Sequence, residues 1–286
     1  MDLRPAELMG RWYPATADLC DAALATAVVP DGDGDAFGAI VPHAGWTYSG
    51  TVAFEALAAV QRRRPDADLV VVFGGHLGPR DPMRVFLGGA WETPYGPAEI
   101  AGELAEDIAM GIECDPETPD EYYDDNAVEV VMPMVKKLWP DARFLTIGVP
   151  PTERATKIGA EVLDLARRRG YERIVAVGST DLTHYGPNYR YVPHGRGRVG
   201  LDWVKNVNDP ELIAKLEAFD STRIVWTAQR SRNACCPGAA AAAMAVAKGL
   251  GAQRGVVTRY TTSYDVRPHE DEPTSFVGYV GVVLER

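Results

Sequence analysis

Three of the five histidines, His43, His76 and His184, each follow a short apolar run that ends in a turn. A neutral imidazole is a common ligand for first-row metals, and an imidazole also transfers protons near neutral pH. Glycines next to His43 and His76 allow the backbone and a ligand to approach each other closely. The pattern therefore indicates metal ligands at His43 and His76 or, alternatively, hydrogen-bonding side chains that cap two turns.

Two adjacent cysteines, Cys235 and Cys236, directly precede Pro237, which begins an Ala-rich run typical of a helix. The positive end of a helix dipole favours a thiolate, so Cys235 could bind a metal. A free cysteine is more often a small buried apolar residue, and from the residues alone this reading is favoured for Cys235 and more strongly for Cys236. Cys20 and Cys114 have no histidine or acidic partner at a useful spacing, so we expect both to be structural.

Four acidic residues could take part in the same chemistry. Asp181 could orient a ligand histidine or cap the turn that follows it. Asp125 and Glu129 lie four residues apart, a spacing that places both on one helical face, directed either at a pocket or at solvent. Glu92 is more typical of a turn residue than of a carboxylate ligand.

Aromatic residues flank the candidate ligands. Trp46, Tyr48 and Tyr185 could form a wall for a planar substrate, although core packing explains them equally well. The Gly- and Arg-rich segment 194–198 could receive a substrate carboxylate, but such segments more often keep a mobile loop soluble. His269 is expected to be an exposed loop histidine.

The elements that must position these residues alternate between strand and helix patterns. Continuous apolar runs are typical of strands buried on both faces. Such runs, or shorter strand patterns, are found at 38–41, 69–73, 84–87, 143–149, 173–178, 256–264 and 276–284. Helical spacing is found over 50–62, 98–110, 125–138, 153–169, 210–219 and 237–248. This alternation predicts one α/β domain over residues 1–286, with a mostly parallel central sheet and helices on both faces. Functional groups collect at the carboxyl ends of such strands.

The charge balance limits the partners of the chain. The 286 residues include 29 Lys and Arg against 40 Asp and Glu, which gives a net charge of −11. We therefore expect neither nucleic acid nor an anionic membrane as a partner. No apolar run reaches the ~18 residues that a membrane span needs, and the first residues lack a signal-peptide pattern. These features predict a cytoplasmic protein with reduced thiols.

Several blocks of sequence resemble one family. Residues 42–50, Pro-His-Ala-Gly-Trp-Thr-Tyr-Ser-Gly, resemble the signature of the Memo family, called in prokaryotes the AmmeMemoRadiSam system protein B family. This family is related in fold to class III extradiol ring-cleaving dioxygenases. Further blocks that resemble the family follow in the same order along nearly the whole chain, at 4–14, 89–96, 181–186 and 275–279.

The resemblance implies a metal ion on His43, His76 and Cys235, with Asp181 and His184 lining the same pocket. In the related dioxygenases two histidines and a carboxylate hold ferrous iron, and a further histidine, here matched by His184, moves protons. The resemblance thus implies a class III extradiol dioxygenase-like fold and a non-haem Fe(II) oxygenase. Such an enzyme acts with O₂ on a catechol-like or other small chelating substrate.

Some positions depart from the family pattern. The thiolate of Cys235 replaces a carboxylate and also suits copper or zinc, because it is a softer ligand. Asn126 stands where the family commonly has a histidine, and Tyr264 replaces a small residue. These departures keep an alternative open, a non-catalytic effector that binds a metal or a peptide. The chain could also form a homo-oligomer.

Overall fold

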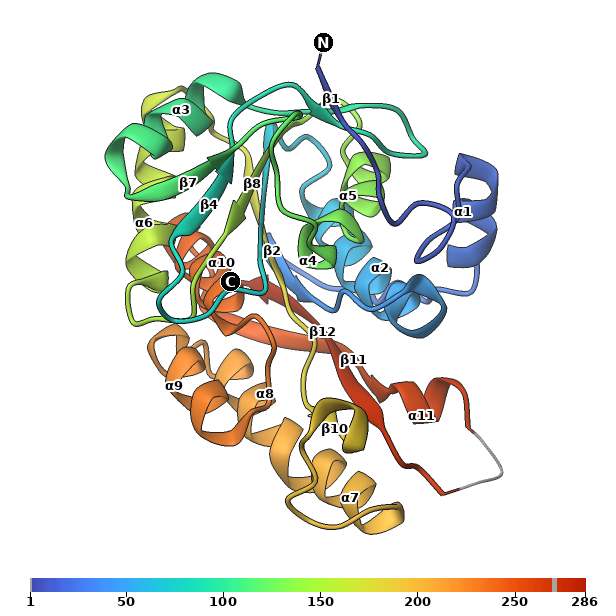
Figure 1. Ribbon diagram of the computed structural model, residues 1–286. Helices are drawn as coiled ribbons and strands as arrows, with labels where there is room; N and C mark the ends of the chain where they lie inside the picture. The colour runs from blue at the N-terminus through green and yellow to red at the C-terminus, as the bar shows by residue number, and fades with distance from the viewer. Residues whose placement is uncertain (1, 269–271) are drawn as a thin grey trace.

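A computed structural model describes residues 2–268 and 272–286 (Figure 1), so His269 lies outside the described residues. The strands of the main sheet are, in spatial order, β10 (His184–Tyr185), β12 (Phe276–Glu285), β2 (Ala36–Val41), β9 (Ile174–Ser179), β3 (Leu69–Gly74), β8 (Arg143–Gly148), β4 (Met83–Phe86) and β7 (Cys114–Glu117), and β11 (Arg254–Thr262) also pairs with β12. A second, small sheet contains β1 (Leu3–Arg4), β5 (Ala90–Trp91) and β6 (Ala98–Glu99).

The centre of the main sheet is parallel. Strand β9 pairs in parallel with β2 and with β3, and β3 pairs in parallel with β8. These strands come from continuous apolar runs, and β2, β3 and β9 are buried along their full length. The outer strands are antiparallel where β12 meets β2 and where β4 meets β8. The predicted α/β fold with a central parallel sheet is therefore confirmed, and antiparallel strands extend it on both sides.

Helices cover both faces of this sheet (Figure 1). One face carries α6 (Ala155–Arg168) and α10 (Pro237–Leu250), next to which lie α3 (Gly102–Gly111) and α9 (Ser221–Ser231). The other face carries α2 (Trp46–Arg63), with α1 (Ala17–Leu24) and α5 (Met132–Leu138) packed against it. The remaining helical segments are α4 (Asn126–Glu129), η1 (Pro187–Tyr189), α7 (Arg198–Trp203), η2 (Val204–Asn208), α8 (Asp209–Glu217) and α11 (Ser263–Val266). No helix in the described ranges is long and apolar enough to cross a bilayer.

Small residues bring α6 and α10 unusually close together. The alanines of α10 are buried between α6 and the sheet. A Cβ atom at Gly159 of α6 would overlap the carbonyl oxygen of Ala242 in α10. This close contact fixes α10, and with it the Cys235–Cys236 segment that immediately precedes the helix.

Two helices predicted from spacing differ in the structure. The pattern over 125–138 forms two helices, because Pro133 lies in the first turn of α5, where its missing N–H does no harm, and cannot continue an earlier helix. The indole N–H of Trp46 also donates a hydrogen bond to the carbonyl of Val130 between the two helices, at 2.9 Å.

The pattern over 98–110 begins as strand β6, and the helix starts only at Gly102.

Candidate metal centre

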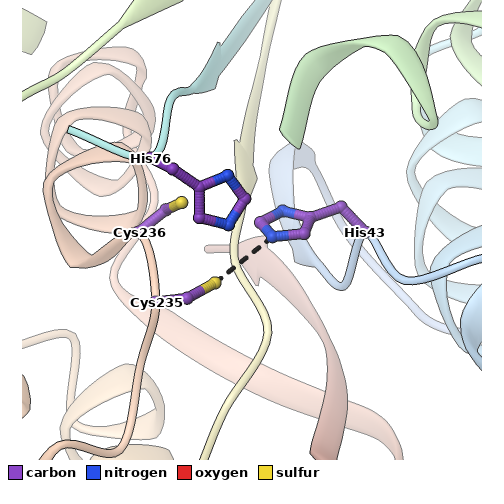
Figure 2. A group of neighbouring side chains, drawn as sticks. All are labelled: His43, His76, Cys235 and Cys236. Carbon is purple, nitrogen blue, oxygen red and sulfur yellow. Dashed lines mark hydrogen bonds between the residues drawn. The ribbon is translucent and has the colours of Figure 1, made fainter. Parts of the chain in front are cut away.

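Four side chains from three separate segments meet at the carboxyl edge of the sheet. His43 follows β2, His76 follows β3, and Cys235 and Cys236 precede α10 (Figure 2). Potential ligand atoms of all four lie within 4.8 Å of one another. The imidazole rings of His43 and His76 meet edge to face with their centres 4.9 Å apart, and His43 Nε2 lies 3.2 Å from Cys235 Sγ. The structure therefore brings together the three residues expected to bind a metal.

His43 is held by the neighbouring strand β9. Its Nδ1 lies 2.9 Å from the hydroxyl oxygen of Ser179, the residue that pairs with Val41 across the two parallel strands. The backbone N–H of His43 donates to Asp181 Oδ1 at 2.8 Å. Donation from Nδ1–H to Ser179 leaves Nε2, which faces Cys235, as the nitrogen with a free lone pair.

His76 depends on the carboxylate of Asp125. This carboxylate accepts the backbone N–H of His76 at 2.7 Å and lies 3.0 Å from its Nδ1. Burial alone would lower the pKa of His76, but hydrogen bonds with Asp125 and Cys235 outweigh burial and raise it to about 10. Burial opposes the ionisation of Asp125, and its contacts with His76 outweigh this and hold its pKa at about 2. The structure thus places Asp125 behind His76 and not in the wall of the larger cavity described below.

The two cysteines have different environments. The backbone N–H of Asp181 lies 3.2 Å from Cys235 Sγ, whereas Cys236 is buried in the core. Burial would raise the pKa of the Cys235 thiol, but a hydrogen bond with Cys236 and the nearby imidazoles outweigh burial and lower it. Burial and the adjacent Cys235 raise the pKa of Cys236. Of the two thiols, that of Cys235 is therefore the more readily ionised.

Two cavities reach this centre from different sides. The larger, of about 580 Å³, is lined by His43, His76, Asp181 and His184 together with Tyr48 and Asn126. The smaller, of about 360 Å³, is lined by Cys235 and shares His76, His184 and Tyr189 with the larger one. Ligands can therefore approach the cluster from an aromatic side or from the side of the thiol.

Asp181 and His184 both line the larger cavity, as expected. Asp181 is almost completely buried, and burial raises the pKa of its carboxyl group. His184 is half-buried, its Nδ1 lies 3.2 Å from the carbonyl oxygen of Leu182, and its ring meets Tyr189 edge to face. Donation from Nδ1–H to Leu182 leaves Nε2 as a proton acceptor.

The expected aromatic wall is corrected by the structure, because of its three residues only Tyr48 lines the larger cavity. Trp46 is buried against Tyr13 with its indole N–H bound to a backbone carbonyl. Tyr185 is stacked on Phe276, and its hydroxyl donates to the carbonyl of Gly195 at 2.7 Å. Both residues therefore belong to the core.

Other sequence candidates also have structural partners. Glu92 accepts the backbone N–H of Ala6, and Glu129 accepts the N–H of Leu8 and the hydroxyl of Tyr13. In the segment 194–198, His194 stacks on Trp203 and Arg198 lies over Tyr264, and neither lines the larger cavity. The amide of Asn126 donates to the carbonyl of His43 at 3.1 Å and does line it.

Sequence reasoning missed several residues of the site. Ser179 binds the outer nitrogen of His43, and Arg11, Trp12, Tyr189 and Tyr279 line the larger cavity. Ser179 could have been found as the last residue of the strand beside β2, where a hydroxyl can reach the loop that follows β2. Arg11 and Trp12 lie within a block that resembled the family, but their position over the cavity depends on tertiary packing.

Known proteins share the sequence pattern and the fold of this chain. The family model described as Memo-like protein matches residues 4–283. A MEMO1 family protein of Methanococcoides burtonii is 30% identical over 99% of this chain and 100% of its own, and one of Thermococcus onnurineus is 28% identical over 86% of each. An uncharacterized protein of Escherichia coli K12, JW3007, has a similar fold, with a TM-score of 0.55, 11% identity, and coverage of 87% of this chain and 99% of its own. The chain belongs to the Memo-like protein family.

Proposed function

We propose that His43, His76 and Cys235 bind one metal ion, Fe(II) before copper or zinc, and that the protein is a non-haem oxygenase. Its substrates are O₂ and a catechol-like or other small chelating molecule. The observation that carries this proposal is the arrangement of the two imidazoles. Each has an oxygen partner for its outer nitrogen, Ser179 or Asp125, while the pair of rings meets beside the sulfur of Cys235.

The donor set fits a divalent metal ion. Two imidazole nitrogens and a thiolate form three ligands, and the pKa of Cys235 is lowered, which favours the ionised sulfur that a metal requires. Oxygen partners on the outer nitrogens fix the ring orientations and the tautomers, as is usual for ligand histidines. Three protein ligands leave coordination positions for small molecules, and the larger cavity meets the cluster at His43 and His76.

The bound ion would supply a place where a chelating substrate and O₂ exchange electrons. The chain itself handles the protons. His184 can take a proton from a substrate hydroxyl at Nε2 and return it later, because its Nδ1 is committed to the carbonyl of Leu182. Asp181 holds the backbone of His43 in place. Tyr48 and Tyr189 give the cavity aromatic faces against which a flat substrate can pack.

One departure from the related dioxygenases favours the alternative, a metal-binding effector without turnover. A thiolate is softer than a carboxylate and stabilises copper(I) or zinc relative to iron. Oxygen consumption separates the two functions, because an effector binds the ion but consumes no O₂ above a metal-only control.

The test is anaerobic loading with Fe(II), copper(I) or zinc, followed by oxygen-uptake measurements with a panel of catechols. We expect one ion per chain, and O₂ consumption by the iron form that depends on the catechol. Cys235→Ser should lose most of the metal, whereas the matched change Cys114→Ser, at a distant half-buried thiol, should not. If the rate of O₂ consumption did not depend on the catechol in any metal form, the oxygenase would be rejected. If Cys235→Ser kept its full metal content, the proposed ligand set would be rejected.

A further inference from the structure

Among the described residues that line the larger cavity, Arg11 is the only arginine or lysine. Its Nη2 donates to the carbonyl of Glu7 at 2.6 Å, and within the described part of the chain its guanidinium has no carboxylate partner. A guanidinium carries five N–H donors in a planar fork that matches a carboxylate. Most of these donors are therefore available to a ligand in the cavity.

The backbone that carries Arg11 is firmly anchored. The hydroxyl of Tyr13 donates to the buried carboxylate of Glu129 at 3.0 Å. The carbonyl of Trp12 accepts the N–H of Trp46 at 2.8 Å, and Trp46 is the first residue of α2. The turn with Arg11 is thus tied to the helix that begins directly after the loop of His43, so the backbone of Arg11 is fixed relative to that loop.

The rest of the lining indicates what Arg11 recognises. Five aromatic side chains surround the cavity, namely Trp12, Tyr48, Tyr189, Tyr264 and Tyr279. Aromatic faces favour a flat ring, and about 580 Å³ is ample space for a small ring compound with substituents. The chain as a whole has a net charge of −11 and repels anions, so a specific cation is needed to hold an acidic ligand.

We propose that the substrate is an aromatic acid whose carboxylate pairs with Arg11. The inference rests on the proposed function, in which the chelating oxygens of the same ring face the cluster of His43, His76 and Cys235. Arg11 is accordingly a specificity-determining residue that selects anionic over neutral catechols. It does not touch the reacting atoms.

Other arginines are less well placed for this role. Arg198 lies over the ring of Tyr264, with its guanidinium carbon 5.6 Å from the ring centre, but does not line the larger cavity. Arg232 lines only the smaller cavity and lies 4.5 Å from the ring centre of Tyr191. An acid recognised by Arg232 would bind in the smaller cavity, next to the thiol of Cys235. Variants of Arg232 and Arg11 distinguish this binding mode from binding in the larger cavity.

The test compares equilibrium binding of 3,4-dihydroxybenzoate and 3,4-dihydroxybenzamide, which share the catechol and differ in charge. Titration calorimetry on metal-free and on zinc-loaded protein measures binding without turnover. We expect the acid to bind about tenfold tighter than the amide, a typical effect of one charge-assisted hydrogen-bonded pair. Arg11→Met should abolish this preference and Arg11→Lys should retain part of it. Arg196→Met, the same charge change at an exposed position outside the cavity, should leave it intact.

Equal affinity for acid and amide would overturn the proposal, as would an unchanged preference in Arg11→Met or failure of both ligands to bind in either form. If Arg232→Met lost the preference for the acid and Arg11→Met kept it, the acid would bind in the smaller cavity, and this result would also overturn the proposal. The outcome is independent of oxygen uptake. A protein that selects the acid through Arg11 but consumes no O₂ rejects the proposed oxygenase alone, and one that consumes O₂ without selecting the acid rejects this inference alone.

Discussion

The carboxylate of Asp125 binds both the backbone N–H and the Nδ1 of His76, at 2.7 and 3.0 Å. It also caps α4 by accepting the N–H of Ala127. One side chain thus fixes the position of the loop after β3, the orientation of the imidazole and the start of the next helix. A ligand histidine held in this way presents its other nitrogen in a single direction.

We therefore expect Asp125→Asn to weaken metal binding by about 10- to 100-fold, because the amide cannot hold the Nδ1–H of His76 and cap α4 equally well. Competition with a chromogenic chelator measures the affinity. Asp124→Asn, at the exposed neighbouring position, is the matched control. Unchanged affinity in Asp125→Asn would show that the carboxylate does not orient the ligand.

His184→Ala should keep the metal and lose turnover. The side chain lines both cavities but lies outside the group of potential ligand atoms, so its removal takes away a proton acceptor and no ligand. The expected loss in kcat is about 10²- to 10⁴-fold, typical of a general acid or base. Metal analysis and oxygen uptake on the same preparation check both halves of the prediction. A metal-free His184→Ala protein would make His184 a ligand instead.

The stability of the fold should depend on pH through Asp209. Burial raises the pKa of this carboxyl group from 3.8 to about 7, against hydrogen bonds from Thr183 and Tyr260 that lower it. The folded state therefore keeps a proton that the unfolded chain releases between these two values. The free energy of unfolding should fall as the pH rises through this window, by up to about 1.4 kcal/mol per pH unit.

Urea titrations between pH 4 and 8 check this dependence, with Asp209→Asn as the test variant because its amide carries no charge at any of these pH values. The variant should show a flatter pH profile than the native chain. Asp202→Asn removes an exposed carboxylate from a nearby helix and should leave the profile as it is. Parallel profiles for the native chain and Asp209→Asn would contradict the prediction.

The contact between α6 and α10 predicts a further effect. Gly159→Ala should destabilise the protein by about 1–3 kcal/mol, because the added methyl group meets the carbonyl of Ala242 and pushes the two helices apart. The change should also disturb the cysteines that precede α10. Gly111→Ala, where a Cβ atom meets nothing within 4 Å, is the control. Thermal unfolding of the three proteins gives the comparison, and equal midpoints would rule out the strain.

Part of this site could be predicted from the sequence because it depends on topology alone. Continuous apolar runs identified β3 and β9, and the loops after parallel strands open at one edge of a sheet. His43, His76 and Asp181 follow three neighbouring strands, so their proximity follows from the strand order. The elements that were missed, such as α9 and α7, are short or polar, and only tertiary packing holds them in place.

The errors at the aromatic residues have a local geometric cause. Trp46 and Tyr48 lie in the first turn of α2, where two residues differ by about 200° around the helix, so only one of them can face the cavity. His184 and Tyr185 are successive residues of β10, and successive side chains of a strand point to opposite faces. The partnership of Asp125 with His76 spans 49 residues and arises from a tertiary contact that no local pattern encodes.

The contact between His43 and Cys235 joins residues that are 192 positions apart. During translation, His43 and His76 leave the ribosome long before Cys235 is added, so a nascent chain offers only an incomplete set of metal ligands. An ion held by all three residues would therefore bind after translation and would link the first third of the polypeptide to its last fifth. At free concentrations above its dissociation constant, such an ion would stabilise the folded chain by an amount that rises with the logarithm of its concentration, and a chelator would remove this stabilisation.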